Sequence, residues 1–119
     1  MPRILVVDDE NGVRQSFNMV LKDDYHVLLA GTGQEAMDIF KKNSVDLILL
    51  DILLPDINGL ELLEKFVETD PNTEIIIIND SNQMDLSIAG MELGAFDDFL
   101  IPLDLDALAR RIREAVIGK

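Results

Sequence analysis

Five short apolar runs alternate with five segments of helical periodicity, and this alternation constrains the fold more than any other feature of the sequence. The runs predict strands at residues 3–7, 26–30, 47–50, 75–78 and 99–101. The segments that follow them place apolar residues three or four positions apart, which predicts amphipathic helices at 11–22, 32–40, 58–67, 84–91 and 104–116. Strands that alternate with helices form right-handed β-α-β units, so we predict a parallel sheet with helices on both faces.

The size and composition of the chain suit a single domain. Its 119 residues, 48% of them hydrophobic, allow one compact core. The formal net charge of −13 argues against direct binding to nucleic acid or to an anionic membrane through this domain. No apolar run is long enough for a membrane span, and a chain without cysteine forms neither disulfides nor cysteine-based zinc sites. These features are compatible with a cytoplasmic location, which we expect.

Acidic residues end two of the predicted strands. Asp8 and Asp9 follow the first strand, and Asp51 follows the third. We predict an α/β fold with a flavodoxin-like, doubly wound five-stranded sheet in the order 2-1-3-4-5, in which these two strands are neighbours about 4.8 Å apart. Three carboxylates at this range repel one another unless a cation neutralises them, and Mg²⁺ prefers oxygen ligands. A carboxylate beside Mg²⁺ can accept a phosphoryl group, whereas the simpler interpretation is that the acids only complement nearby helix dipoles.

Four motifs give the whole chain a clear resemblance to a known family. They are ILVVDDE at 4–10, LLDILLPDING at 49–59, GAFD at 94–97 and PLDLD at 102–106. The chain resembles the receiver domains of bacterial two-component response regulators, and its later part is most similar to receivers of nitrogen-regulation-type transcriptional activators. The resemblance implies that Asp51 is the phosphoacceptor and that Asp8, Asp9, Asp51 and the backbone carbonyl of Leu53 bind Mg²⁺.

The same resemblance implies the partners of the domain. A histidine kinase or a phosphotransfer protein would supply the phosphoryl group. An output domain or protein would dock on the face formed by the fourth helix, the fifth strand and the fifth helix, and receivers also form homodimers through this face. We expect residues 1–119 to be one receiver domain, with any downstream output domain lying outside this chain.

Two positions depart from the pattern of the family. Receivers usually carry Ser or Thr at the end of the fourth strand and Lys before the proline that follows the fifth strand, but this chain has Asn79 and Ile101 there. No lysine lies between Lys65 and Lys119 that a shifted alignment could recover. The pocket would then lack its usual ammonium group, which predicts a greater dependence on Mg²⁺. Asn79 retains an amide donor that could contact a phosphoryl oxygen.

Three functions follow from these observations. The first is a phosphorelay receiver in which Asp51 is phosphorylated in a Mg²⁺-dependent reaction, so that catalysis is limited to its own phosphorylation and dephosphorylation. The second is a divergent receiver-like interaction module that works independently of phosphorylation, which Asn79 and Ile101 favour. The third, a Mg²⁺-dependent phosphatase for small molecules, is weaker because it would want an acid two residues after Asp51, where Leu53 stands.

Several other residues have simpler expected roles. His26, the only histidine, is expected to be structural or solvated. The apolar residues of the fourth helix are expected to lie in the core, and Gly90 is expected to make this helix the weakest, since glycine costs about 1 kcal/mol relative to alanine in a helix. The basic cluster of the last helix is expected to be a solvated face, the alternative being that it pairs with acids of a second copy. The apolar residues of the fourth helix are Met84, Ile88 and Met91, and the basic cluster of the last helix consists of Arg110, Arg111 and Arg113.

Overall fold

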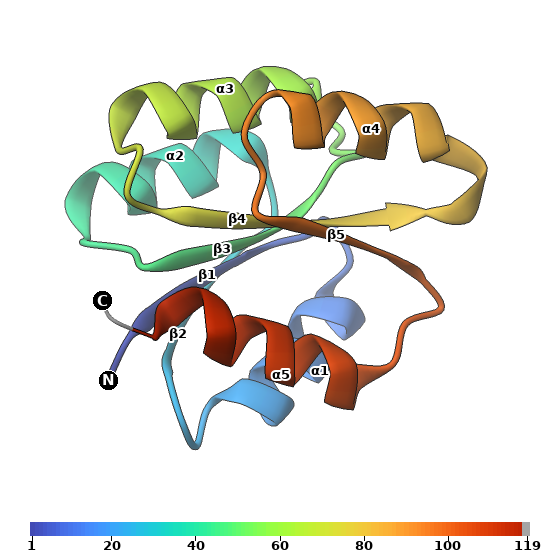
Figure 1. Ribbon diagram of the computed structural model, residues 1–119. Helices are drawn as coiled ribbons and strands as arrows, with labels where there is room; N and C mark the ends of the chain where they lie inside the picture. Colours follow the sequence, from blue (N-terminus) through green and yellow to red (C-terminus); the bar gives the residue numbers. More distant parts are fainter. Residues whose placement is uncertain (118–119) are drawn as a thin grey trace.

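The computed structural model describes residues 1–117, which form a five-stranded parallel sheet between two layers of helices (Figure 1). The strand order is β2-β1-β3-β4-β5, as predicted. The strands are β1 (Arg3–Val7), β2 (His26–Ala30), β3 (Leu47–Asp51), β4 (Glu74–Asp80) and β5 (Asp97–Ile101). The helices are α1 (Asn11–Leu21), α2 (Gly33–Lys42), α3 (Gly59–Thr69), α4 (Met84–Glu92) and α5 (Leu105–Val116), with a short 3-10 turn at Ser81–Gln83. Residues 118 and 119, which end the predicted domain, lie outside the described part.

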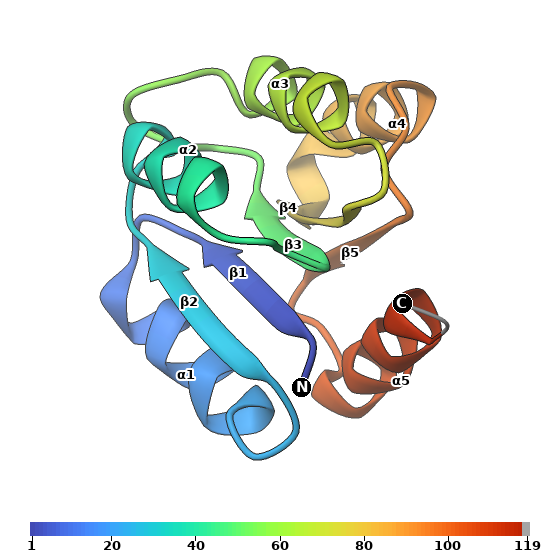
Figure 2. The same cartoon turned by 90° about the vertical axis from the view of Figure 1, so that its left-hand side faces the viewer.

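The helices cover the two faces of the sheet unequally. Helices α2, α3 and α4 pack on one face and α1 and α5 on the other, as both views show (Figures 1 and 2). Along β1, Leu5 and Val7 belong to the core on the side of α2, α3 and α4, and Ile4 and Val6 belong to the core on the side of α1 and α5. A strand that is buried on both faces needs apolar residues at every position, which is why the central strands are continuous apolar runs. None of the helices within residues 1–117 is long and apolar enough to cross a bilayer.

Two strands extend by more than one residue beyond the apolar runs that predicted them. β4 continues through Asn79 and Asp80, beyond the predicted end at residue 78, and β5 begins at Asp97 rather than at Phe99. The ladder between them pairs Ile76 with Asp97 and Asp80 with Ile101. Backbone pairing therefore continues through polar residues at the edges of the apolar runs. Hydrophobicity alone does not mark these strand ends.

Side-chain caps begin three of the helices, α2, α3 and α5. Thr32 Oγ1 accepts a hydrogen bond from the backbone N–H of Glu35 at 3.1 Å, and Asn58 Oδ1 accepts one from Leu60 at 2.8 Å. Asp104 Oδ1 accepts hydrogen bonds from two backbone N–H groups at the start of α5. These caps satisfy donors that have no partner within the helix, so each helix begins where its cap residue ends the preceding loop.

The expected core role of the apolar residues of α4 is wrong. Met84, Ile88 and Met91 are 49%, 58% and 39% exposed. The helix instead buries two small residues, Ser87 and Gly90, of which Gly90 packs against Ile77 of β4. Small residues on the buried side let the helix approach the sheet closely, and this turns the larger apolar side chains outward. Val20 in α1 and Leu105 in α5 are further apolar helix residues that lie outward, each 40% exposed.

We expect Gly90→Ala to destabilise the protein, although alanine is the better helix former. A Cβ at position 90 would lie 2.1 Å from Cδ1 of Ile77, which is fully buried in the core. Overpacking of this kind costs about 1–3 kcal/mol and outweighs the propensity gain of about 1 kcal/mol. The matched control is Gly12→Ala in α1, where a Cβ meets nothing within 4 Å and should stabilise. Urea unfolding midpoints that move in the same direction for both variants would contradict this account.

The basic cluster of α5 forms contacts within the chain. Arg111 Nε lies 2.7 Å from a carboxylate oxygen of Asp97, and Arg111 Nη1 lies 2.6 Å from Glu114. The guanidinium also lies 4.2 Å from the centre of the Phe96 ring. Arg111 is therefore more than a solvated cation, because acids of its own chain, Asp97 and Glu114, already pair with it. His26 is exposed at the start of β2, as expected for a solvated residue.

Candidate functional site

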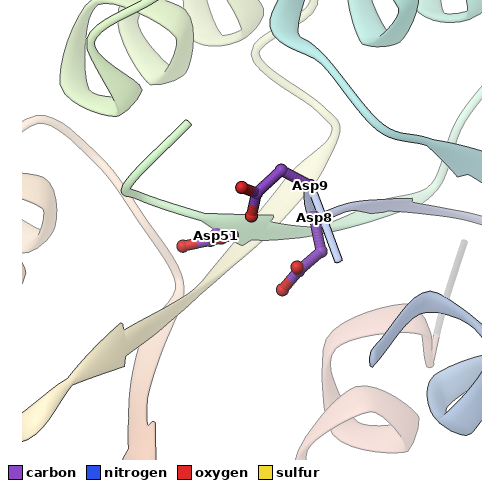
Figure 3. A group of neighbouring side chains, drawn as sticks. All are labelled: Asp8, Asp9 and Asp51. Atoms are coloured by element: carbon purple, nitrogen blue, oxygen red, sulfur yellow. The ribbon is translucent and has the colours of Figure 1, made fainter. Parts of the chain in front are cut away.

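Three carboxylates converge at the carboxyl ends of β1 and β3. Asp8 and Asp9 follow β1, Asp51 is the last residue of β3, and the two strands pair directly through Val7 and Leu50. One carboxylate oxygen from each acid can be chosen such that all lie within 4.8 Å of one another (Figure 3). Asp8 is buried, Asp51 is half-buried and Asp9 is exposed. The structure thus brings together the three acids that the sequence predicted to meet.

Backbone donors fix the orientation of two of these acids. Asp8 Oδ1 accepts a hydrogen bond from the N–H of Glu10 at 2.9 Å, and Asp51 Oδ1 accepts one from the N–H of Leu53 at 3.0 Å. Arg14 Nη1 donates to the backbone carbonyl of Asp8 at 2.7 Å. This guanidinium hydrogen is therefore bound to main chain and not to a carboxylate of the cluster. One oxygen of Asp51 is held in place while the other carries no backbone bond.

The close approach of the acids changes their protonation. Burial, followed by the neighbouring carboxylates of Asp8 and Asp9, raises the pKa of Asp51 to about 7 against the lowering effect of the Leu53 hydrogen bond. Burial also raises the pKa of Asp8. A carboxyl group in such surroundings disfavours its charged form unless a cation compensates. The site is electrostatically suited to a metal ion.

The acids line a hollow of about 430 Å³, which is also lined by Asn79 and Ile101, the two residues that depart from the family pattern. None of the described lining residues carries a positive charge. Ile101 is 47% exposed and borders the hollow where the resemblance places a lysine. The lining residues are Asp8, Asp9, Glu10, Val13, Asp51, Leu53, Asn79, Asp80 and Ile101.

Asn79 lines the hollow, but its amide is already engaged. The side chain is 1% exposed, and its Nδ2 donates to the carbonyl of Gln83 at 2.6 Å and to Ser87 Oγ at 3.0 Å. Its Oδ1 accepts from the N–H of Asp80 at 2.9 Å. The donor that the sequence suggested for a phosphoryl oxygen is thus committed to the start of α4. Sequence reasoning missed Gln83 and Ser87 because no motif links a strand residue to a serine eight positions later.

Gly59 permits the close approach of the loop after β3 to the start of α3. A Cβ at position 59 would lie 2.1 Å from the backbone oxygen of Ile52. Leu53 pairs with Asn58 in an isolated antiparallel bridge, which closes the loop just before the glycine. Leu53 lines the hollow, and its backbone N–H contacts Asp51. The specific spacing from Asp51 to Gly59 therefore has a steric cause.

A parallel sheet in this order, with clustered acids at the switch point between β1 and β3, defines a flavodoxin-like domain with an acidic pocket. Residues 4–113 match the response regulator receiver domain family, and the chain belongs to this family. It is therefore a receiver domain of two-component phosphorelay signalling, a class of domain that typically binds Mg²⁺ and works with histidine kinases or phosphotransfer proteins.

Individual relatives agree with this assignment. The chain is 37% identical over 115 residues to sporulation initiation phosphotransferase F of Bacillus subtilis, covering 96% of this chain and 90% of that protein. It is 35% identical over 112 residues to response regulator MprA of Mycobacterium sp. (strain KMS), covering 93% of this chain but only 49% of that protein. The chain thus spans about half the length of relatives such as MprA.

Solved structures match the fold closely. A receiver domain protein from Clostridium thermocellum superimposes with a TM-score of 0.92 at 29% identity, covering 98% of this chain and 94% of that one. The receiver domain of NtrX from Brucella abortus gives a TM-score of 0.92 at 25% identity, covering 98% and 99%. These neighbours confirm the predicted fold class and include a receiver of the type that the later motifs resemble.

Proposed function

We propose that Asp51 accepts a phosphoryl group from a phosphohistidine of a kinase or phosphotransfer protein, in a reaction that depends on Mg²⁺. The observation that carries this proposal is the convergence of three carboxylates at the ends of two adjacent strands. Membership of the receiver family supports it independently. The phosphorylated state would then be relayed as a conformational change to an output partner.

The residues present fit a magnesium ion. Asp8, Asp9 and Asp51 offer only oxygen donors, and a hard divalent cation prefers such ligands. Leu53 lines the same hollow, and its backbone carbonyl is the fourth proposed ligand. The raised pKa of Asp51 and of Asp8 marks a cluster of negative charge that none of the described lining residues compensates with a positive charge. When bound, Mg²⁺ supplies positive charge that stabilises the phosphoryl oxygens during transfer.

Asp51 has the geometry of a nucleophile. The Leu53 N–H holds Oδ1, and the second oxygen is available to attack phosphorus. In the proposed transfer an oxygen of the Asp51 carboxylate forms the new P–O bond while the P–N bond to the donor imidazole breaks. The imidazole nitrogen keeps the bonding electron pair. Because only the ionised carboxylate is a good nucleophile, the reaction should slow as the pH falls below the pKa of Asp51.

We expect a small-molecule phosphodonor with Mg²⁺ to add the mass of one phosphoryl group to the intact protein. Asp51→Asn should abolish the addition, because an amide cannot form the acyl phosphate. Asp56→Asn is the matched control, since Asp56 caps α2 through the backbone N–H groups of Gly33 and Gln34 and lies outside the acidic hollow. The proposal fails if no mass is gained under conditions in which a standard receiver reacts, or if Asp51→Asn still gains it.

The second candidate function is an interaction module that works without phosphorylation. It is favoured by the pocket itself, in which Ile101 replaces a cation and the Asn79 amide is turned to α4. Titration with Mg²⁺ and then with a phosphoryl analogue separates the two functions. Tight Mg²⁺-dependent binding of the analogue supports the receiver proposal, whereas the absence of binding supports the module.

The proposed output surface is the face formed by α4, β5 and α5. Three exposed apolar residues of α4 support it, because they give the face side chains that a partner or a second copy could cover. Relatives of about twice this length are compatible with an output domain joined to the receiver, and the relative that is covered to 90% is compatible with a separate output protein. A cytoplasmic location belongs to the same proposal, since the phosphoryl group of a histidine kinase comes from ATP.

A further inference from the structure

Asn79 is the one described side chain that both lines the acidic hollow and donates to a side chain of α4. It is the sixth residue of β4, whose partner at this level of the sheet is Leu100 of β5. The hydrogen bond from Nδ2 to Ser87 Oγ is buried, and Ser87 itself is 2% exposed. A buried hydrogen bond between two neighbouring elements fixes their relative position more firmly than an exposed one.

The orientation of the amide follows from its partners. The carbonyl of Gln83 can only accept a hydrogen bond, so the atom of Asn79 that faces it must be the NH₂ group. The N–H of Asp80 can only donate, so it must face Oδ1. Both amide hydrogens are consequently used on Gln83 and Ser87. An oxygen atom entering the hollow would have to take one of them from its present acceptor.

We propose that Ser87 is a positioning residue that holds the Asn79 amide away from the acidic hollow, so that filling the hollow with a phosphoryl group releases Ser87 and loosens the first turns of α4. This inference rests on the proposed function of Asp51. The amide hydrogen that Asn79 donates to Ser87 is the one to be released, because that hydrogen bond of 3.0 Å is longer than the hydrogen bond of 2.6 Å to Gln83. The exposed residues Met84 and Ile88 flank this part of the helix.

The arrangement is a competition for one donor. In the empty state Ser87 accepts the hydrogen bond, and in the filled state a phosphoryl oxygen accepts it. A group shifts such an equilibrium only by its difference in affinity for the two states. Removing the Ser87 hydroxyl leaves the amide hydrogen without an acceptor only in the empty state. The filled state is therefore stabilised relative to the empty state, and the phosphoryl group binds more tightly. A serine with a purely structural role would weaken binding or leave it unchanged when it is removed.

We expect Ser87→Ala to bind beryllium trifluoride in the presence of Mg²⁺ about three- to tenfold more tightly than the wild-type domain, the range that one hydrogen bond of ordinary strength produces. Asn79→Ala and the double variant Asn79→Ala/Ser87→Ala should bind the probe equally, because without the amide there is no competition. If Asn79→Ala fails to fold, Asn79→Val, whose side chain has no hydrogen-bond donor, takes its place. Ser16→Ala in α1 is the matched control, since its hydroxyl donates to Gly12 on an exposed helix face, and it should bind like the wild type.

A second measurement tests the same contact without the probe. NMR of the free domain should show both side-chain amide protons of Asn79 protected from exchange with solvent, and Ser87→Ala should remove the protection of one of them. If the wild type binds the probe and Ser87→Ala binds it equally or more weakly, the inference about Ser87 is overturned and the proposed function stands. If neither binds the probe, the proposed function fails and the inference fails with it. A Ser87 effect that persists without the Asn79 amide would also overturn it.

Discussion

Asp51→Asn is expected to unfold at a higher urea concentration than the wild type at pH 8 in the absence of divalent cations. Burial and the neighbouring acids raise the pKa of Asp51 from 3.8 to about 7, so the ionised side chain is unfavourable in the folded protein. A change of this size corresponds to at most about 4 kcal/mol, and solvent access to the half-buried group lowers it to about 1–3 kcal/mol. An uncharged side chain of the same size should recover this free energy of unfolding.

The pH dependence gives the prediction its sign. Because the pKa is higher in the folded state, the folded protein binds the proton more tightly than the unfolded chain. The neutral carboxyl group therefore stabilises the protein fully below about pH 4, and this contribution is lost as the pH rises through about 7. The difference between Asp51→Asn and the wild type should be small at pH 4, grow through this window and level off above it.

A carboxylate with the opposite shift provides the control. The N–H groups of Gly33 and Gln34 lower the pKa of Asp56, so its contribution is present above pH 4 and lost as the pH falls below that value. Asp56→Asn should therefore destabilise the protein at pH 8, not stabilise it. An Asp51→Asn variant that is no more stable than the wild type at pH 8 would contradict the electrostatic account of the site.

Magnesium should reverse the order of stability. A ligand that binds only the folded state adds about 2.7 kcal/mol at a concentration one hundred times its Kd. The wild type should gain this stabilisation from Mg²⁺, since the ion compensates the charges of Asp8, Asp9 and Asp51. Asp51→Asn should gain much less, because it has lost one of the proposed ligands. Removing Mg²⁺ with a chelator should restore the original order.

The sequence was sufficient for the fold and for the acidic cluster because both follow from local patterns. Buried parallel strands need continuous apolar runs, and residues that end adjacent parallel strands must meet at one edge of the sheet. Asp8 and Asp51 could therefore be placed together without coordinates. Their order in the sheet came from the flavodoxin-like connection, which the observed β2-β1-β3-β4-β5 arrangement confirms.

The sequence failed where packing decides which side of an element faces inward. In α4 the apolar spacing of Met84, Ile88 and Met91 indicated the core, yet the helix turns Ser87 and Gly90 toward β4. Hydrophobicity does not register that a small residue allows a closer approach to the sheet. The bonding of the Asn79 amide was equally unpredictable, because it depends on how the 3-10 turn at Ser81–Gln83 brings α4 back over β4.

Ile101→Lys is expected to have the largest effect on the occupied state of the site. Ile101 borders the hollow that contains Asp51, and none of the described residues lining that hollow is basic. An ammonium group at this position can form a charge-assisted hydrogen bond with a phosphoryl oxygen, which contributes about 1.5–3 kcal/mol. We expect beryllium trifluoride to bind about ten- to a hundredfold more tightly with Mg²⁺ present, and the Mg²⁺ concentration required for binding to fall.

The control must separate the effect of the position of the new charge from the effect of the change in net charge. Leu105→Lys makes the same change in net charge at the start of α5, where the exposed Leu105 lines a neighbouring apolar groove together with Ile101 but lies outside the acidic hollow. Titration of both variants, at low salt and at 0.5 M salt, should show a large gain that persists in salt only for Ile101→Lys, since exposed charges more than a few ångströms apart are screened there. Equal gains for the two lysines would mean that only the overall charge of the domain matters. No gain for Ile101→Lys would mean that the missing ammonium does not limit phosphoryl binding in this pocket.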